Sequence, residues 1–227
     1  MRTAAVLPIK RFGNAKQRLA DTVVDGLRLE LARAMVADVL LALAHTTRIE
    51  RTIVVTGEDG VRAGAADIGA TIVEDAAEEG QPAAVALGVR RAIADGFERV
   101  LCVPGDCPAL DPGELEGLLD PAGARPPEVV VLPDRHGTGT NGLLLSPPDA
   151  IAPAFGPGSF RRHRSLAEAA GVRCRVERLP SLLLDVDTGD DLAALRERLS
   201  QQGARAIRTR AALGLTAGDP VSISASA

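Results

Sequence analysis

The first residues in the chain that could do chemistry are two lysines, Lys10 and Lys16, which are the only lysines among 26 basic residues. An ammonium is a compact charge on a flexible stem, whereas a guanidinium is a planar fork, so the two are not interchangeable. Both lysines follow the short apolar run 4–9, in a loop that also carries Arg11 and Arg18. A cationic loop after a first strand predicts a phosphate-binding site in an α/β protein, and a solvated basic loop is the alternative.

A carboxylate occupies the corresponding place after a later apolar run. Residues 100–103 lead directly into Pro-Gly-Asp-Cys-Pro, which places Asp106 just beyond the carboxyl end of a buried strand. Open α/β sheets bind ligands at that edge, and Gly105 would let a ligand approach the backbone closely. Asp106 is therefore a candidate ligand for a metal or a ribose. The alternative is a turn-forming aspartate beside proline.

A second acidic cluster contains Asp185 and Asp187, after the run Leu182-Leu183-Leu184. Thr188 and Asp191 have the spacing of a capping box for a final helix, which gives Asp191 a structural role. Asp185 and Asp187 have no such role. Mg²⁺ favours one or two carboxylates together with substrate phosphates, and these two residues with Asp106 meet that requirement.

Two glycine-containing segments are further candidates. In the segment 155–163, Ser159 is expected to be the N-cap of a helix whose first N–H groups bind an anion, or of an ordinary capped helix. Ser159 and His163 are four residues apart and share a helical face. The segment 134–142 is either a long hairpin turn or a clamp of N–H and hydroxyl donors for a small acid.

The elements that must position these residues alternate between strand and helix. Apolar runs rich in β-branched residues predict strands at 4–9, 52–56, 70–73, 100–103, 129–132, 143–145 and 172–176. Helical patterns cover 83–94, 112–119, 161–170 and 190–199, and a five-turn helix carries Leu27, Leu31, Met35 and Val39. This alternation predicts a three-layer α/β/α fold with a mostly parallel mixed sheet. We expect one domain over 1–214 and a frayed tail over 215–227, with 120–128 as a connector.

Composition excludes several classes of function. The net charge is −4, and no basic stripe interleaved with aromatic residues is present, so no nucleic acid is expected as a partner. No apolar run approaches 18 residues, so no membrane association is expected and a cytoplasmic location is the default. The three cysteines are not spaced in the close pairs that are typical of metal sites, and Cys102 is expected to be a core residue. Neither a nucleophile elbow nor a P-loop is present, so covalent catalysis has no obvious nucleophile.

Taken in order, the motifs resemble those of GT-A-like nucleotidyltransferases, and within them the guanylyltransferases that make the deazaflavin coenzyme factor 420. The resemblance rests on Leu7-Pro8-Ile9-Lys10 with Ala15–Leu19, Pro104–Pro108, Gly137–Asn141, Gly156–His163 and Asp185-Val186-Asp187-Thr188. The first two stretches are shared by nucleotidyltransferases in general, and the last three narrow the resemblance. It covers nearly the whole chain.

The resemblance implies transfer of GMP from GTP to a small phosphorylated carboxylic acid: phosphoenolpyruvate, 2-phospho-L-lactate or 3-phosphoglycerate. It implies a Rossmann-like GT-A fold and Mg²⁺ held by Asp106, Asp185 and Asp187. It also implies a nucleotide site formed by Leu7, Pro8, Lys10, Lys16, Arg18, Gln81 and Gly105, with Lys10, Lys16 and Asp106 as the catalytic residues. The acceptor acid would be bound by Thr140, Asn141, Gly156 and Ser159. A homodimer is compatible with the sequence.

Two departures from the family pattern bear on these expectations. The family commonly has Leu-Asn-Ala-Ala where this chain has Gln81-Pro82-Ala83-Ala84, so a contact usually assigned to nucleotide recognition is either lost or taken over by Gln81. Gly189 replaces a usual proline at the start of the last helix. Two rival functions stay open: a nucleotidyltransferase that uses CTP or a sugar phosphate, and a non-catalytic nucleotide-binding regulatory domain.

Overall fold

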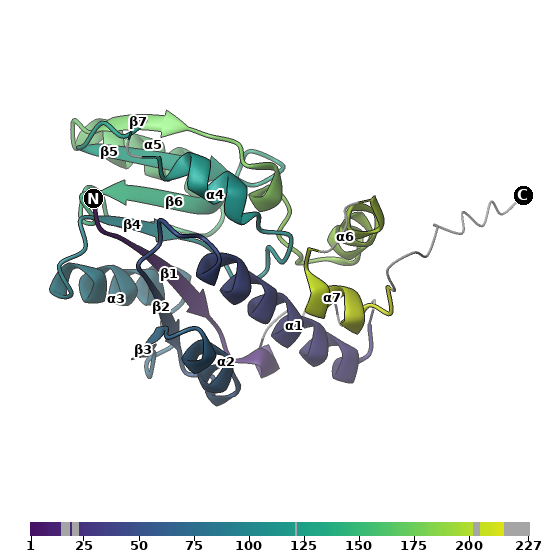
Figure 1. Cartoon of the computed structure of the whole chain (residues 1–227). Coiled ribbons are helices and arrows are strands. Elements are labelled where there is room, and N and C mark those ends of the chain that lie inside the picture. The colour runs from purple at the N-terminus through teal and green to yellow at the C-terminus, as the bar shows by residue number, and fades with distance from the viewer. Residues whose placement is uncertain (15–18, 20–22, 121, 202–204, 216–227) are drawn as a thin grey trace, which may run out of the picture.

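A seven-stranded sheet with helices on both faces forms the body of the protein (Figure 1). The computed structural model describes residues 1–14, 19, 23–120, 122–201 and 205–215. The strands are β1 (Thr3–Ile9), β2 (Arg51–Thr56), β3 (Thr71–Glu74), β4 (Arg99–Cys102), β5 (Glu128–Pro133), β6 (Thr140–Ser146) and β7 (Arg173–Val176). Every strand expected from the sequence is present.

Seven α-helices occur in the described part of the chain. They are α1 (Asp25–Ala44), α2 (Arg62–Asp67), α3 (Gln81–Ala94), α4 (Pro112–Leu118), α5 (Ser159–Ala169), α6 (Gly189–Gln201) and α7 (Ile207–Ala212). Short 3-10 turns cover Phe12–Asn14, Asp59–Val61 and Pro180–Leu182. The two shortest helices, α2 and α7, were not predicted, because six residues do not complete two turns of an amphipathic pattern.

The sheet has the order β3-β2-β1-β4-β6-β5-β7, and β6 is the strand that runs antiparallel to both of its neighbours. The expected mostly parallel mixed sheet is therefore confirmed. Because β1, β2, β3 and β4 are parallel, their carboxyl ends meet at one edge of the sheet. The loops after these four strands are brought together there, as in other open α/β sheets.

Alternation along β1 divides the interior into two apolar layers. Leu7 and Ile9 pack with α1 on one face, whereas Val6 packs with α3 on the other. Successive side chains of a strand point to opposite faces, so a nearly continuous apolar strand is what a sheet covered on both sides requires. Cys102 is fully buried among these residues, as expected, and burial raises the pKa of its thiol.

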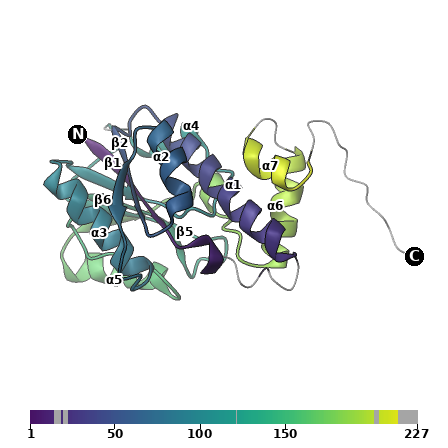
Figure 2. The ribbon, with the colours of Figure 1, turned by 90° about the horizontal axis from the view of Figure 1, so that it is seen from below.

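A third apolar cluster joins the carboxyl-terminal helices to the amino-terminal half of α1. Leu31 and Met35 of α1 contact Val186 and Leu192, and the turned view shows α6 and α7 beside α1 (Figure 2). The buried carboxylate of Asp38 accepts hydrogen bonds from the N–H groups of Arg208 (3.1 Å) and Thr209 (2.8 Å). This capping explains how a six-residue helix is held in place.

Leu215 is the one residue of the expected tail, 215–227, that the structure describes. Leu215 donates its N–H to Arg210 and packs against the third cluster, so it belongs to the folded domain. Residues 216–227 lie outside the described part of the chain.

Gly88 provides a test of how tightly α3 packs on the sheet. A Cβ at this position would lie 2.4 Å from Val6 Cγ1 and 3.0 Å from Val55 Cγ2. Gly88→Ala is therefore expected to destabilise the protein by about 1–3 kcal/mol through overpacking.

The matched control is Gly117→Ala in α4, where a Cβ meets nothing within 4 Å. Because alanine favours a helix, this control should be neutral or stabilising by up to about 1 kcal/mol. Urea unfolding of both variants measures the difference, and equal stabilities would contradict the close approach of α3.

Candidate active site

A cavity of about 460 Å³ lies at the carboxyl edge of the parallel strands. It is lined by residues from the loops after β1, β2, β3 and β4, from α1 and α3, and from the segment before α6: Pro8, Ile9, Lys10, Arg11, Phe12, Ala32, Met35, Val36, Gly57, Asp75, Glu78, Gly80, Gln81, Ala84, Pro104, Gly105, Asp106 and Asp187. Its volume falls in the range of ligand pockets. Residues nearly 180 positions apart in the sequence therefore line the same cavity.

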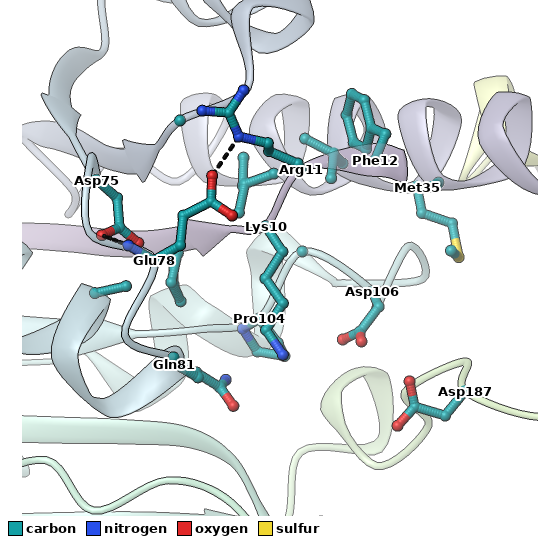
Figure 3. Close-up of a pocket in the computed structure, with 18 residues that line it drawn as sticks. Lys10, Arg11, Phe12, Met35, Asp75, Glu78, Gln81, Pro104, Asp106 and Asp187 are labelled. Atoms are coloured by element: carbon teal, nitrogen blue, oxygen red, sulfur yellow. Dashed lines mark hydrogen bonds and ion pairs between the residues drawn. The ribbon is translucent and has the colours of Figure 1, made fainter. Parts of the chain in front are cut away.

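Asp106 and Asp187 line one end of this cavity (Figure 3). A backbone hydrogen bond, from the Val186 N–H to the Asp106 carbonyl (3.2 Å), joins the two segments. The Val186 side chain is fully buried in the third apolar cluster. Asp187 lines the cavity, whereas Asp185 does not.

The electrostatics of this end fit a divalent cation. Burial raises the pKa of Asp185, and the negative charges of Asp106 and Asp187 raise it further. Three carboxylates that repel one another are stabilised by a bound cation. Within the described residues, no group of three His, Cys, Asp or Glu side chains is placed to hold a metal ion, and this includes the expected set of Asp106, Asp185 and Asp187. This is compatible with Mg²⁺, which takes one or two carboxylates and completes its shell with substrate oxygens and water.

Asn141 connects the acidic end to the sheet. Its Nδ2 donates to the Leu182 carbonyl (2.8 Å) and to Asp185 Oδ1 (3.1 Å), and its side chain is buried. Leu132 pairs with Gly142 and Pro133 with Thr140, so Asn141 is the extra residue of a β-bulge. Bulges redirect side chains near functional sites. Asn141 therefore orients Asp185, a contact that its expected role in binding the acceptor did not include.

The cationic loop is only partly described. Lys10 is exposed at the end of β1 and lies between the two ends of the cavity (Figure 3). Arg11 forms an ion pair with Glu78, and this contact raises the pKa of the guanidinium. Lys16 and Arg18 lie outside the described residues, so their expected contacts with a nucleotide stay predictions.

The remaining expected nucleotide residues differ in their placement. Pro8, Gln81 and Gly105 line the cavity, and Gln81 begins α3. Leu7 is fully buried in the apolar layer on the α1 face and does not line the cavity. A Cβ at Gly105 would lie 3.0 Å from Val36 Cγ2, so the lack of a side chain there serves packing against α1 as well as access to the cavity.

Thr140 and Ser159, both expected to bind the acceptor, are buried and do not line this cavity, and neither does Gly156. The Thr140 hydroxyl contacts His163 Nδ1 (3.0 Å), and His163 Nε2 accepts the Ala154 N–H (2.9 Å). Accepting at Nε2 leaves the ring proton on Nδ1, from where it is donated to Thr140. Burial, with the nearby Arg162 guanidinium, lowers the pKa of His163 to about 4. The ring is thus neutral at pH 7 and ties α5 to β6.

The expectation that Ser159 is a helix N-cap is wrong. The helix already includes Ser159, and its N-cap is Gly158 in the left-handed region at φ 72°. The N–H groups of Ser159 and Phe160 donate to the carbonyls of Gly156 and Thr138. They are therefore already used within the protein, and the predicted anion site at this helix start is not formed by them.

Two further expectations are confirmed: a hairpin turn in the segment 134–142 and a capping box formed by Thr188 and Asp191. In the segment 134–142, residues 134–139 form the hairpin turn between β5 and β6, and residues 140–142 belong to β6. The Asp134 carboxylate closes the turn by accepting the N–H groups of Thr138 (3.0 Å) and Gly139 (2.9 Å). Thr188 and Asp191 form the predicted capping box, with the Thr188 N–H donated to Asp191 at 2.8 Å. The pKa of Asp191 is lowered by these hydrogen bonds in spite of burial.

Comparison with known proteins identifies the family. The family model described as "Guanylyl transferase CofC like" matches residues 3–206. The chain belongs to this family. It is 47% identical over 213 residues to phosphoenolpyruvate guanylyltransferase of Conexibacter woesei, covering 94% of this chain and 96% of that one. It is 34% identical over 195 residues to 2-phospho-L-lactate guanylyltransferase of Methanothermobacter thermautotrophicus, covering 86% and 84%.

The fold agrees with that assignment. The structure superimposes with a TM-score of 0.73 on a putative nucleotide-diphospho-sugar transferase from Desulfovibrio desulfuricans G20, at 19% identity and over 94% of this chain and 95% of that one. The predicted GT-A-like nucleotidyltransferase fold of this CofC-like guanylyltransferase is thus confirmed. No helix in the described ranges is both long enough and apolar enough to cross a membrane.

Sequence reasoning missed two carboxylates of the cavity in this CofC-like protein, Asp75 and Glu78, and placed Arg11 only in the cationic loop. Asp75 and Glu78 follow β3, and Arg11 stands beside Lys10. Asp75 directly follows β3, and a carboxylate soon after the end of a parallel strand was a usable signal, as it was for Asp106 after β4. Glu78 carried no such signal, because its place depends on the ion pair with Arg11.

The pKa of His163 predicts a pH dependence of stability. A lowered pKa means that the folded state resists protonation, so stability is complete above pH 6.5 and is lost as the pH falls towards 4. His163→Gln keeps an acceptor for the Ala154 N–H but does not titrate. Between pH 7 and pH 4.5, the wild type is expected to lose about 2–3 kcal/mol more unfolding free energy than this variant. Parallel pH profiles from urea unfolding would count against a neutral buried ring.

Asn141→Ala tests the orientation of Asp185, which the sequence analysis expects to be a Mg²⁺ ligand. Removing a group that orients a metal ligand typically weakens metal affinity about 10–100-fold. We expect that loss for Mn²⁺, a spectroscopic substitute for Mg²⁺, titrated by electron paramagnetic resonance. The control is His163→Gln, which changes a buried contact of the neighbouring Thr140 but none of Asp185. Unchanged affinity in the Asn141 variant would show that the amide does not orient the carboxylate.

Proposed function

We propose that this protein transfers GMP from GTP to the phosphate of phosphoenolpyruvate and releases pyrophosphate. The observation that carries the proposal is the cavity, which brings Lys10, Asp106 and Asp187 from three distant segments to one edge of the sheet. An exposed ammonium next to a pair of carboxylates suits a nucleoside triphosphate bound with a divalent ion. Membership of the CofC-like guanylyltransferase family supports the choice of nucleotide.

The reaction requires no protein nucleophile. An oxygen of the acceptor phosphate is already an anion at neutral pH, and it attacks the α-phosphorus of GTP in line while pyrophosphate leaves. The new bond joins the acceptor oxygen to phosphorus, and the broken bond is the one between the α-phosphorus and the bridging oxygen. Catalysis then depends on positioning and on charge neutralisation. This agrees with the lack of a nucleophile motif in the sequence.

Two reacting anions repel each other, so fixed charges must hold them together. We assign Lys10 to the phosphates of the nucleotide, because its ammonium lies exposed between the two ends of the cavity. Lys16 and Arg18 keep the same proposed role. Asp106, Asp185 and Asp187 stay the proposed Mg²⁺ ligands, of which one or two would bind the ion directly. The ion supplies positive charge to the phosphate oxygens when bound.

The acceptor is proposed to lie near β6. Asn141 contacts Asp185 directly, so an acceptor phosphate on the cation would lie beside the bulge that contains Asn141. Thr140, Gly156 and Ser159 stay proposed acceptor residues on the strength of the family resemblance. Phosphoenolpyruvate is favoured over 2-phospho-L-lactate because the relative named for it is 47% identical, against 34%. The product would enter biosynthesis of the coenzyme factor 420.

Product analysis tests the proposed reaction. The protein, GTP and Mg²⁺ are incubated with a mixture of phosphoenolpyruvate, 2-phospho-L-lactate and 3-phosphoglycerate. The products are then identified by mass spectrometry. We expect the GMP adduct of phosphoenolpyruvate to dominate and to require Mg²⁺. A parallel panel with ATP, CTP and UTP separates the rival nucleotidyltransferases. Binding of GTP with no adduct to any acid would support a non-catalytic domain instead.

Asp106→Ala and Lys10→Ala test the assigned roles. Removing one oriented electrostatic group typically lowers the rate by about 10²–10³, and we expect at least that for each variant. The control is Asp67→Ala, which removes an exposed carboxylate at the end of α2 and should turn over normally. Circular dichroism shows whether each variant is folded. Near-normal turnover by folded Asp106→Ala would remove this carboxylate from the mechanism.

A further inference from the structure

The end of the cavity opposite Asp106 and Asp187 is also acidic. Asp75 and Glu78 line it, together with Gln81 (Figure 3). In a site proposed to bind a polyanion, these carboxylates would repel phosphates from this end. The carboxylates must therefore face a part of the ligand that carries hydrogen-bond donors and no negative charge.

Of these two carboxylates, that of Asp75 is the more firmly placed. Its backbone N–H donates to the Thr56 carbonyl at the end of β2 (3.3 Å), and its side chain is 8% exposed. Oδ1 accepts the Glu78 N–H (3.2 Å). Burial and these hydrogen bonds hold the carboxylate in place at the wall of the cavity that it lines.

Glu78 has a different task. Its carboxylate forms an ion pair with Arg11, which neutralises its charge. A Cβ at Gly57 would lie 3.1 Å from Glu78 Oε1 and 3.3 Å from Arg11 Nη2, so the pair packs directly on the Gly57 backbone. Glu78 also has φ 48°, in the left-handed region that non-glycine residues rarely adopt. The pair with Arg11 and the bond to Asp75 hold it there and close this end of the cavity.

We propose that Asp75 selects the base of the nucleotide by accepting hydrogen bonds from the N1–H and the 2-amino group of guanine. A carboxylate only accepts, and of the four common bases guanine alone presents two adjacent donors to one carboxylate. Adenine and cytosine place a ring acceptor beside their amino group, and uracil offers one N–H between two carbonyls. The inference rests on the proposed function, because it assumes that the triphosphate lies at the end with Lys10.

A site built to bond a substrate donor rejects the analogue that lacks it, since its own polar group is then left unpaired. Inosine triphosphate differs from GTP only by loss of the 2-amino group, so it isolates the proposed contact. The wild type is expected to prefer GTP over inosine triphosphate by about 10–100-fold in kcat/KM, as a charge-assisted hydrogen bond implies. ATP should be rejected more strongly.

Asp75→Asn is the decisive variant. Asparagine keeps an oxygen for the Glu78 N–H but places an amide NH₂ where the second carboxylate oxygen was, opposite the donors of guanine. We expect kcat/KM for GTP to fall at least about 10-fold and the preference over inosine triphosphate to shrink to about 3-fold or less. KM for the acceptor acid should not change. The matched control is Glu74→Gln, one residue earlier, whose side chain pairs with Arg62 and does not line the cavity; it should keep the full preference.

Thermal shifts with GTP or inosine triphosphate, measured without an acceptor, separate this inference from the proposed reaction. Loss of the GTP preference in Asp75→Asn but not in Glu74→Gln supports the assignment, whatever the acceptor proves to be. An undiminished preference in folded Asp75→Asn would overturn it and leave guanylyl transfer intact. If the wild type itself prefers CTP or ATP, both the inference and the proposed nucleotide are wrong.

Discussion

The site depends on the hydrogen bond from the Val186 N–H to the Asp106 carbonyl, because this contact joins the loop after β4 to the segment before α6. It brings carboxylates of like charge together, an arrangement that folding alone does not favour. The apolar side chain of Val186, buried against α1, supplies the compensating stabilisation. The result is a cluster of carboxylates that repel one another, and a bound divalent cation would relieve this repulsion. Binding of the cation is therefore expected to stabilise the folded protein.

The helices α6 and α7 help to hold that contact in place. They form an apolar cluster with Leu31 and Met35 of α1, and Asp38 caps α7. Val186 anchors the segment with Asp185 and Asp187 in this cluster, and Asn141 of β6 donates a hydrogen bond to Asp185. The acidic end of the cavity is therefore fixed from two directions, as preorganised binding of a cation and a polyphosphate requires.

The two ends of the cavity divide the work of recognition. Asp106 and Asp187 lie at the end that suits a cation and phosphates, and Asp75 and Glu78 lie at the other. Lys10 stands between them (Figure 3). A ligand with a polyanionic end and a neutral end rich in donors matches this order of charges, and a nucleotide of guanine has that form.

The sequence by itself determined the alternation of strands and helices, the placement of Asp106 after β4 and the capping box of Thr188 and Asp191, because these follow from local periodicity and spacing. Tertiary structure alone decided the antiparallel direction of β6, the burial of Ser159 inside α5 and the bond from Asn141 to Asp185. Strand direction and side-chain partners arise from contacts between segments far apart in the chain, which no local pattern records. The short α7 belongs to the same class, since Asp38 and the apolar face of α1 hold it rather than its own six residues.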